Sequence, residues 1–214
     1  MNTRKLRPSL QRILAYRRKK RVSFLLSKVD TKSRMKILDL GCGPDGRSFE
    51  DFAPADWQIV GVDVMAPEEI HIEHPGFTYV RQDAGDLSRF QDLEFDLLVS
   101  FGMLEHIIDE AKYRQVVSEI IRVAQQYIIV IPNKYALIEP HYGFPFFALF
   151  PHPIQAALVK IFNLSDARRD LKKDPDFIRK RCVWRSHAQC RKDFPGSRIY
   201  TLHTLDSIAI VKSL

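Results

Sequence analysis

The chain has 214 residues, of which 45% are hydrophobic and 28% are charged. This length allows one domain with a full core, and this hydrophobic content excludes an intrinsically disordered class. The longest apolar stretches, near 126–132 and 144–150, are too short for a membrane-spanning helix of roughly 20 residues. No apolar run follows the basic N-terminus as in a signal peptide, so we expect a cytoplasmic protein. A peripheral contact with a membrane is left open.

The net charge of +7 is unevenly distributed along the chain. Residues 1–28 hold ten Lys or Arg and no acidic residue, residues 29–159 balance at −10, and residues 160–193 balance at +6. This asymmetry favours an anionic partner, which is a phosphate, a lipid headgroup or a nucleic acid, or it reflects solvated charge alone. Both interpretations stay open.

The three cysteines predict neither a disulfide framework nor a metal site. Cys42, Cys182 and Cys190 are odd in number and lack paired spacing. Cys182, His187 and Cys190 would make three zinc ligands, but a fourth ligand is missing from the pattern. We therefore expect no metal.

Residues 1–30 predict a basic helical arm. Leu6, Leu10 and Leu14 lie on one helical face, five consecutive charges follow at 17–21, and helical spacing of apolar residues resumes at Val22. One or two amphipathic helices account for this pattern. Such an arm lies on an anionic membrane or packs on the domain as a lid.

Short apolar strands then alternate with other segments, at 36–40, 58–64, 77–81, 95–101 and 127–131. A helix is expected from about Arg47, and Asp109 has the position of an N-cap for a long helix before the fifth strand. This alternation predicts a parallel sheet with helices on both faces. Two further strands, at 198–203 and 207–212, must be antiparallel because only three residues separate them.

Residues 133–195 interrupt this alternation. They hold several prolines and phenylalanines between 140 and 153, an apolar helical pattern at 154–164 and a charged, weakly patterned helical segment at 166–182. Ser186 and Gln189 form a capping-box pattern for a short helix. We expect an insertion here.

The strongest motif is Ile-Leu-Asp-Leu-Gly-Cys-Gly-Pro-Asp-Gly at 37–46, a strand that enters a glycine loop. Gly41, Gly43 and Gly46 satisfy the dinucleotide fingerprint, which makes a nicotinamide oxidoreductase one alternative. Against it, Asp39 would face a diphosphate unfavourably but would pair with an amino-bearing ligand. The antiparallel strand pair at the end also does not extend a dinucleotide-binding half.

These residues resemble the first motif of the class I S-adenosylmethionine-dependent methyltransferases, and the resemblance covers about 35–132 and the final strand pair. It implies an α/β, Rossmann-like, doubly wound, mostly parallel seven-stranded sheet with an antiparallel last strand. It also implies S-adenosylmethionine as the cofactor, with Gly41, Cys42 and Gly43 lining it and Asp39 near its amino group. The family often has glycine where Asp45 stands, which leaves a non-catalytic S-adenosylmethionine-binding protein as an alternative.

The resemblance assigns further cofactor contacts to the ends of the next strands. Asp63, 20 residues after Gly43, matches the acid that accepts hydrogen bonds from the ribose hydroxyls, with Val64 beside it. Asp83 and Ala84 are expected at the adenine, with Asp86 as the alternative to Asp83. Ser100 and Phe101 end the fourth strand beside the cofactor.

Three residues are the candidates for catalysis. His106 belongs to a Leu-Glu-His element that recurs in a subgroup with many small-molecule methyltransferases, and it acts as a general base or, with Glu105, braces the loop. Glu139 and His141 follow the fifth strand, where ligands bind in open α/β folds. His141 is the better candidate for the base, and a structural tie between this loop and the arm is the alternative.

We therefore expect a methyltransferase that acts on a small-molecule or lipid/glycan-type acceptor by O-methylation. In this interpretation residues 31–214 form the methyltransferase domain, and the insertion at about 133–195 forms an acceptor-side lid. The phenylalanines at 144–150 and the basic arm favour an anionic or amphiphilic acceptor, with a peripheral membrane contact through residues 1–28. An RNA or other nucleic-acid methyltransferase is the less favoured alternative, because the tetrapeptide Asn/Asp-Pro-Pro-aromatic does not follow the fourth strand.

Overall fold

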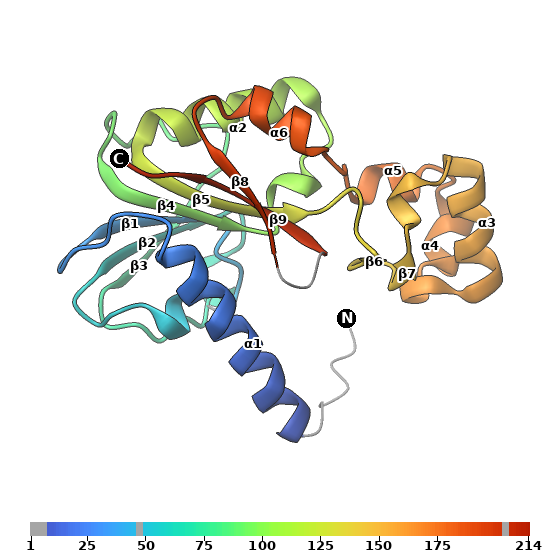
Figure 1. Ribbon diagram of the computed structural model, residues 1–214, viewed down its shortest axis with the longest axis horizontal. Coiled ribbons are helices and arrows are strands. Elements are labelled where there is room, and N and C mark those ends of the chain that lie inside the picture. The colour runs from blue at the N-terminus through green and yellow to red at the C-terminus, as the bar shows by residue number, and fades with distance from the viewer. Residues whose placement is uncertain (1–7, 46–48, 203–205) are drawn as a thin grey trace.

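The computed structural model describes residues 8–45, 49–202 and 206–214. Its main feature is a seven-stranded sheet of order β3-β2-β1-β4-β5-β9-β8 (Figure 1). The first five strands are parallel, and β9 runs antiparallel to both β5 and β8. The predicted Rossmann-like sheet with an antiparallel last strand is confirmed. The strands are β1 Lys36–Leu40, β2 Gln58–Asp63, β3 Phe77–Arg81, β4 Phe95–Phe101, β5 Ala124–Pro132, β8 Arg198–Thr201 and β9 Ser207–Lys212.

The central strands are buried on both faces, which explains their nearly continuous apolar sequences. Five of the seven residues of β4 are apolar or aromatic, the exceptions being Asp96 and Ser100, and all but Asp96 and Phe101 are buried. By contrast β3, at the edge of the sheet, alternates between exposed and half-buried residues. Burial therefore follows the strand order.

Helices cover the two faces of the sheet. On one face α1, Pro8–Leu26, packs Val22 and Leu25 in a cluster with Phe49 and Trp57. On the other face α2, Glu110–Val123, and α6, His187–Asp193, share a second cluster with the sheet. Figure 1 shows α1 on one side of the sheet and α2 with α6 on the opposite side. The sheet is thus doubly wound, as predicted.

Two predicted helix starts are present in the structure. The carboxylate of Asp109 accepts a hydrogen bond from the backbone N–H of Lys112 at 2.7 Å, so Asp109 is the N-cap of α2. Ser186 and Gln189 form a reciprocal capping box at the start of α6. In these two cases the capping residues predicted the helix starts from the sequence.

The helix expected from about Arg47 is not present in the described part of that segment. Residues 46–48, including Gly46 of the glycine motif, lie outside the described residues, and the chain from Phe49 forms only a 3-10 turn, Glu50–Phe52. Pro54 follows, and β2 begins at Gln58, so the segment has room for only one turn. A second 3-10 turn, Pro67–Glu69, stands between β2 and β3.

A separate lobe follows β5. It contains β6 Ile138–Glu139, β7 Phe144–Pro145, α3 His152–Phe162, α4 Arg168–Lys173 and α5 Phe177–Arg181. Its own core includes Tyr142, Phe147, Val159 and Ile178. The chain leaves the main domain at Asn133 and comes back to it at Arg185, and these two residues form an isolated β-bridge. The expected insertion at 133–195 thus divides in the structure, since α6 packs Cys190 in the core of the main domain.

The basic arm forms one helix rather than two, because α1 continues through the charged run at 17–21. Of the apolar face expected at its start, Leu6 lies outside the described residues. Among the helices in residues 8–45, 49–202 and 206–214, none is long and apolar enough to cross a membrane.

Candidate active site

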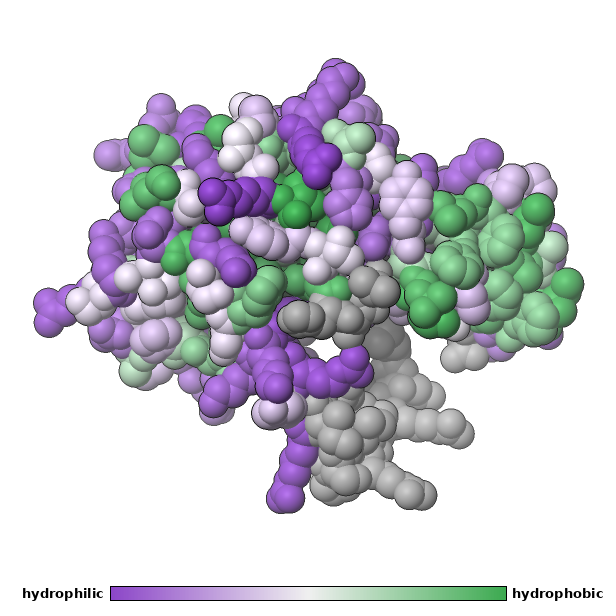
Figure 2. Space-filling model, in the orientation of Figure 1, coloured by the Kyte–Doolittle hydropathy of each residue, from purple (hydrophilic) through white to green (hydrophobic). Residues whose placement is uncertain are grey.

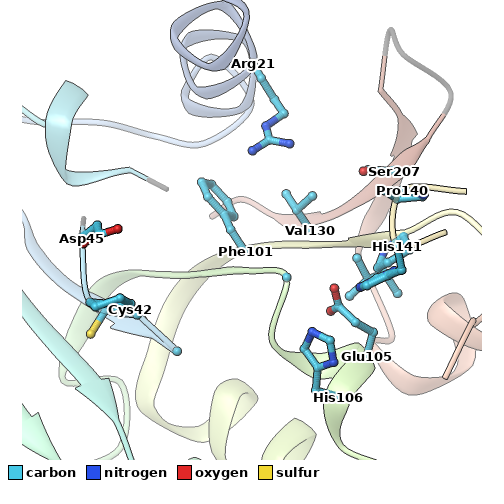
Figure 3. Close-up of a pocket in the computed structure, with 16 residues that line it drawn as sticks. Arg21, Cys42, Asp45, Phe101, Glu105, His106, Val130, Pro140, His141 and Ser207 are labelled. Carbon is cyan, nitrogen blue, oxygen red and sulfur yellow. The ribbon is translucent and has the colours of Figure 1, made fainter. Parts of the chain in front are cut away.

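One cavity of about 570 Å³ lies where the carboxyl ends of β1, β4 and β5 meet. Figure 3 shows the glycine loop on one side of this cavity and Glu105, His106 and His141 on the other, with Arg21 of α1 above them. The cavity also touches the lobe through Pro140 and the last strand through Ser207. It therefore joins the predicted cofactor loop to the predicted catalytic residues.

The glycine loop has the backbone conformation that only glycine adopts without strain. Gly41 and Gly43 have φ angles of +78° and +64°. The N–H of Gly41 donates to the carbonyl of Val62 at 2.7 Å, which ties the loop to the end of β2. A Cβ at Gly43 would meet no atom within 4 Å, so this glycine borders open space. The open cradle fits a ligand that approaches the backbone closely.

Asp63 holds the loop in place from the end of β2. One of its carboxylate oxygens accepts a hydrogen bond from the N–H of Gly43 at 3.1 Å, and the other accepts from the N–H of Val64 at 2.7 Å. The oxygen that accepts from Val64 also accepts from the N–H of Met65 at 3.3 Å. The oxygen that accepts from Gly43 can accept a further bond, so the predicted contact with the ribose hydroxyls stays chemically open. Val64 itself is exposed beside it.

Asp39 and Cys42 are both buried beside the loop. Asp39 stands in β1 opposite Gly61 of β2 and Val99 of β4. Burial, followed by the charges of Asp39 and Asp63, raises the pKa of the Cys42 thiol far above its ordinary value. A thiol in this state is a poor nucleophile, so Cys42 serves as a lining residue.

The other predicted cofactor residues are distributed unevenly around the cavity. Phe101 lines it. Ser100 is fully buried at the end of β4, and its hydroxyl meets no hydrogen-bond partner among the described residues. Asp83 instead pairs with Lys112 of α2 and accepts a bond from the N–H of Gly85 at 2.8 Å. The bond from Lys112 and that from Gly85 lower the pKa of Asp83. Neither Asp83 nor Ala84, which packs against the core, is among the lining residues.

Glu139 and His141 form a hydrogen-bonded pair at the lobe end of the cavity. Nδ1 of His141 is 2.7 Å from a carboxylate oxygen of Glu139, which is fully buried. Glu139 also accepts from the backbone N–H of Tyr142 at 2.7 Å and from the indole N–H of Trp184 at 3.0 Å. Glu139 therefore orients His141, and only His141 of the two lines the cavity.

Glu105 and His106 lie opposite this pair, in the 3-10 turn Leu104–His106 that follows β4. The rings of His106 and His141 meet edge to face with centroids 5.5 Å apart. Glu105 is 3% exposed, and burial raises the pKa of its carboxyl above the ordinary value. The structure thus brings all three predicted catalytic residues together and adds Glu105.

Sequence reasoning missed three contributors to this region. Arg21 reaches the cavity from α1, with its guanidinium 5.9 Å from the ring centroid of Phe101. Trp184 holds Glu139, and the carbonyl of Arg181 accepts from His106. Arg21 ends the basic run at 17–21, so the sequence did mark it as part of a charged segment. His106 and Arg181 are 75 positions apart, and no sequence pattern predicts their contact.

The chain matches a family model described as a methyltransferase domain over residues 38–129. It is also 31% identical over 91 residues to the cyclopropane-fatty-acyl-phospholipid synthase of Escherichia coli strain K12. That match covers 41% of this chain and 23% of the relative, so the chain spans only about a quarter of this curated relative.

Solved structures share the fold at low identity. A SAM-dependent methyltransferase from Archaeoglobus fulgidus has a TM-score of 0.60 at 15% identity and covers 92% of this chain and 93% of its own. The magnesium protoporphyrin IX methyltransferase of Synechocystis PCC 6803, with bound S-adenosylhomocysteine, has a TM-score of 0.54 at 17% identity, over 92% of this chain and 82% of that chain. The predicted family and its cofactor, S-adenosylmethionine, are confirmed. Residues 38–129 therefore match the methyltransferase-domain family, and the sheet topology and the glycine loop are those predicted for a class I S-adenosylmethionine-dependent methyltransferase.

Proposed function

We propose that this protein methylates a hydroxyl oxygen of a small-molecule or lipid/glycan-type acceptor. The proposal rests on the cavity that joins the glycine loop to His141, with Glu139 behind it. Bound S-adenosylmethionine supplies a methyl group on a sulfonium, which is transferred by in-line displacement. A hydroxyl acceptor must then be aligned and must lose its proton.

The cofactor is held, in this proposal, by residues at the ends of β1 and β2. Gly41, Cys42 and Gly43 line the methionine part, with Asp39 near the amino group, and Asp63 accepts from the ribose. Asp63 has a double role, because it also fixes the N–H of Gly43. Asp83 and Ala84 contact the adenine in this proposal, which requires the carboxylate of Asp83 to leave Lys112. Ser100 and Phe101 lie beside the cofactor at the end of β4.

His141 is the proposed general base. With its Nδ1–H donated to Glu139, its Nε2 keeps a lone pair that can accept the hydroxyl proton. Glu139 holds this tautomer and stabilises the charge that develops on the ring. His106, across the cavity, is the second candidate for the base.

Surface chemistry supports an anionic or amphiphilic acceptor. Figure 2 shows hydrophobic side chains gathered over the lobe. The exposed apolar residues there include Phe146, Leu149, Ile154, Ile161 and Phe162. Patches of this kind mark surfaces that bind apolar partners. The matched relative is by name a fatty-acyl-phospholipid synthase, which agrees with a lipid-type acceptor.

A peripheral membrane contact through α1 is part of the same proposal. Arg17, Lys19 and Lys20 are exposed on this helix, and Arg21 reaches from it into the cavity. Each basic residue near an anionic lipid surface adds about 1 kcal/mol of attraction. A cytoplasmic protein that visits an anionic membrane would meet its acceptor there.

The cofactor site is tested by calorimetry with S-adenosylhomocysteine. We expect binding by the full chain, no comparable binding of NADH, and weakening by the Asp63→Ala substitution. Asp56→Ala, at an exposed acid before β2, is the matched control and should bind normally. Preference for NADH, or equal affinity of both variants, would contradict the assignment.

The acceptor side is tested by flotation and by turnover. We expect the protein to float with vesicles that contain phosphatidylglycerol and not with pure phosphatidylcholine, and to lose flotation when Arg17, Lys19 and Lys20 are changed to Gln. Salt-dependent RNA binding without flotation would favour the nucleic-acid alternative. Full turnover of His141→Ala on an identified acceptor would show that His141 is not the base.

A further inference from the structure

Three side chains of metal-ligating type converge at the lobe end of the cavity. One ligand atom each from Glu105, His106 and His141 lie within 4.8 Å of one another. All three residues line the cavity, and Figure 3 shows them gathered on the side away from the glycine loop. Two of them come from the turn after β4 and the third comes from the lobe.

Both histidines are oriented by hydrogen bonds on the ring nitrogen Nδ1. Nδ1 of His106 lies 2.8 Å from the carbonyl oxygen of Arg181, which can only accept. Nδ1 of His141 lies 2.7 Å from Glu139. Each ring therefore carries its proton on Nδ1 and keeps a lone pair on Nε2. Histidines that ligate metals have this arrangement, in which the second nitrogen donates to a carbonyl or a carboxylate.

Glu105 supplies an independent observation. Its Oε2 is buried and has no hydrogen-bond partner among the described residues, although the side chain lines a cavity. A buried carboxylate oxygen without a donor is costly in free energy. A bound cation would remove this cost.

We propose that Glu105, His106 and His141 bind a divalent first-row transition-metal cation, with Glu139 and the Arg181 carbonyl as the outer acceptors that orient the two rings. Two imidazoles and one carboxylate suit Zn²⁺, Fe²⁺, Co²⁺ or Mn²⁺ better than Mg²⁺ or Ca²⁺, which prefer oxygen ligands. The site was not expected from the sequence, where only the spacing of cysteines was considered.

The geometry requires little adjustment. Zinc bonds of about 2.0–2.2 Å place neighbouring ligand atoms about 3 to 3.5 Å apart. The ligand atoms of the three residues lie within 4.8 Å of one another, so modest side-chain rotations must bring them to these separations. Three protein ligands leave at least one coordination position open toward the cavity, as in catalytic metal sites.

The use of this cation rests on the proposed function, whereas its binding does not. As a Lewis acid it would lower the pKa of an acceptor hydroxyl beside the methyl donor. A cation on Nε2 of His141 occupies the lone pair that the proposed base would use. In the loaded protein His141 is therefore a ligand, and its role as the base belongs to the metal-free protein.

Metal binding is measured on the full chain without any methyl donor. The protein is stripped with a chelator and titrated with Zn²⁺ by calorimetry and with Co²⁺ by visible absorption. We expect one cation per chain, no comparable heat with Mg²⁺, and d–d bands of Co²⁺ without a thiolate charge-transfer band. The missing thiolate band separates this site from the buried thiols of Cys182 and Cys190.

Variants decide which residues hold the cation. We expect Glu105→Gln and His106→Gln each to weaken binding at least tenfold, and Glu73→Gln, at an exposed acid outside the cavity, to leave it unchanged. Circular dichroism checks the fold of each variant, so that one misfolded variant does not decide the result. Absence of binding in the full chain, or full binding by both folded cavity variants, would overturn the proposal. The S-adenosylhomocysteine titration fails or succeeds separately.

Discussion

At the residue scale, the two glycines of the loop, Gly41 and Gly43, differ in the space that is free beside them. A Cβ at Gly41 would lie 2.6 Å from Cγ of Met103 and 2.7 Å from its Cβ, whereas a Cβ at Gly43 would meet nothing within 4 Å. Both have positive φ angles, so alanine costs about 1–2 kcal/mol at either position. The two positions therefore differ in side-chain packing and not in backbone conformation.

This difference predicts that alanine has different effects at the two positions. Gly43→Ala should lower Tm by about 2–8 °C from its backbone cost alone, and it should strongly weaken S-adenosylhomocysteine binding because its methyl group enters the cradle. Gly41→Ala should lower Tm further, since overpacking adds about 1–3 kcal/mol. Differential scanning calorimetry and ligand titration on both variants measure the two effects. Equal Tm values would show that Met103 moves aside without cost.

Glu105 predicts a dependence of stability on pH. Its carboxyl has a raised pKa because of burial, while protonated His106 and His141 would favour the charged form and Glu139 disfavours it. A raised carboxyl pKa gives stability that is present below the unfolded-state pKa and is lost as pH rises through the folded-state pKa. The neutral variant Glu105→Gln avoids that loss.

In the presence of a chelator, we therefore expect Glu105→Gln to have a higher Tm than the unchanged protein at pH 8. The difference in Tm should be smaller at pH 5 than at pH 8, because a raised pKa makes the protonated fraction of this carboxyl at pH 5 larger than that of an ordinary glutamate. Thermal unfolding at both pH values measures it. A variant that is less stable at pH 8 would mean that the carboxylate is compensated within the protein.

At the element scale, the strands were predictable and the connections between them were not. The predicted bounds of β1, β3, β4 and β9 agree with the structure, because each is a short run that is rich in apolar residues. In the described parts of the connections from β1 to β3, the helical segments are the 3-10 turns Glu50–Phe52 and Pro67–Glu69, each with a proline in or near it. The pattern of apolar residues predicts a strand from its own sequence, but it does not predict whether the connection to the next strand forms a helix.

The candidate site was predictable to the same extent. Residues next to strand ends, such as Asp63 and His141, were identified because the fold fixes where strand ends meet. Trp184 and Arg181 were not identified, because they are 45 and 75 positions along the chain from their partners Glu139 and His106. The unpaired oxygen of Glu105 is likewise a product of tertiary packing.

The capping box of α6 gives a prediction for a single element. Ser186→Ala removes the hydroxyl that accepts from the N–H of Gln189 and should cost about 1 kcal/mol, or about 2–4 °C in Tm. Ser118→Ala is the matched control, because Ser118 is exposed inside α2, where alanine is the better helix former. That variant should be unchanged or slightly more stable. A loss of stability in both variants would point to an effect unrelated to capping.

At the scale of the whole molecule, the protein has three cores with different boundaries. Two of them lie on the two faces of the sheet and share its strands. The third draws its buried residues only from 142–178, within the lobe. The links between the lobe and the main domain include the Asn133–Arg185 bridge, the bond from the N–H of Val183 to the carbonyl of Glu105 and the bond between His106 and the carbonyl of Arg181. Because its core is separate, we expect the lobe to open while the sheet stays folded.

Native-state hydrogen exchange should resolve this organisation. Amides of α3 and α5 should exchange through opening of the lobe, faster than amides of β1, β4 and β5, which require global unfolding. Addition of S-adenosylhomocysteine should slow exchange in the glycine loop and leave α3 nearly unchanged, since α3 does not border the cavity. Addition of Zn²⁺ should instead slow exchange in the lobe, because His141 and the turn at Glu105 would be linked through one cation. Equal protection of α3 and β4 without any ligand would mean that the lobe and the sheet unfold as one unit, and the cavity between them would then be permanent rather than able to open for an acceptor.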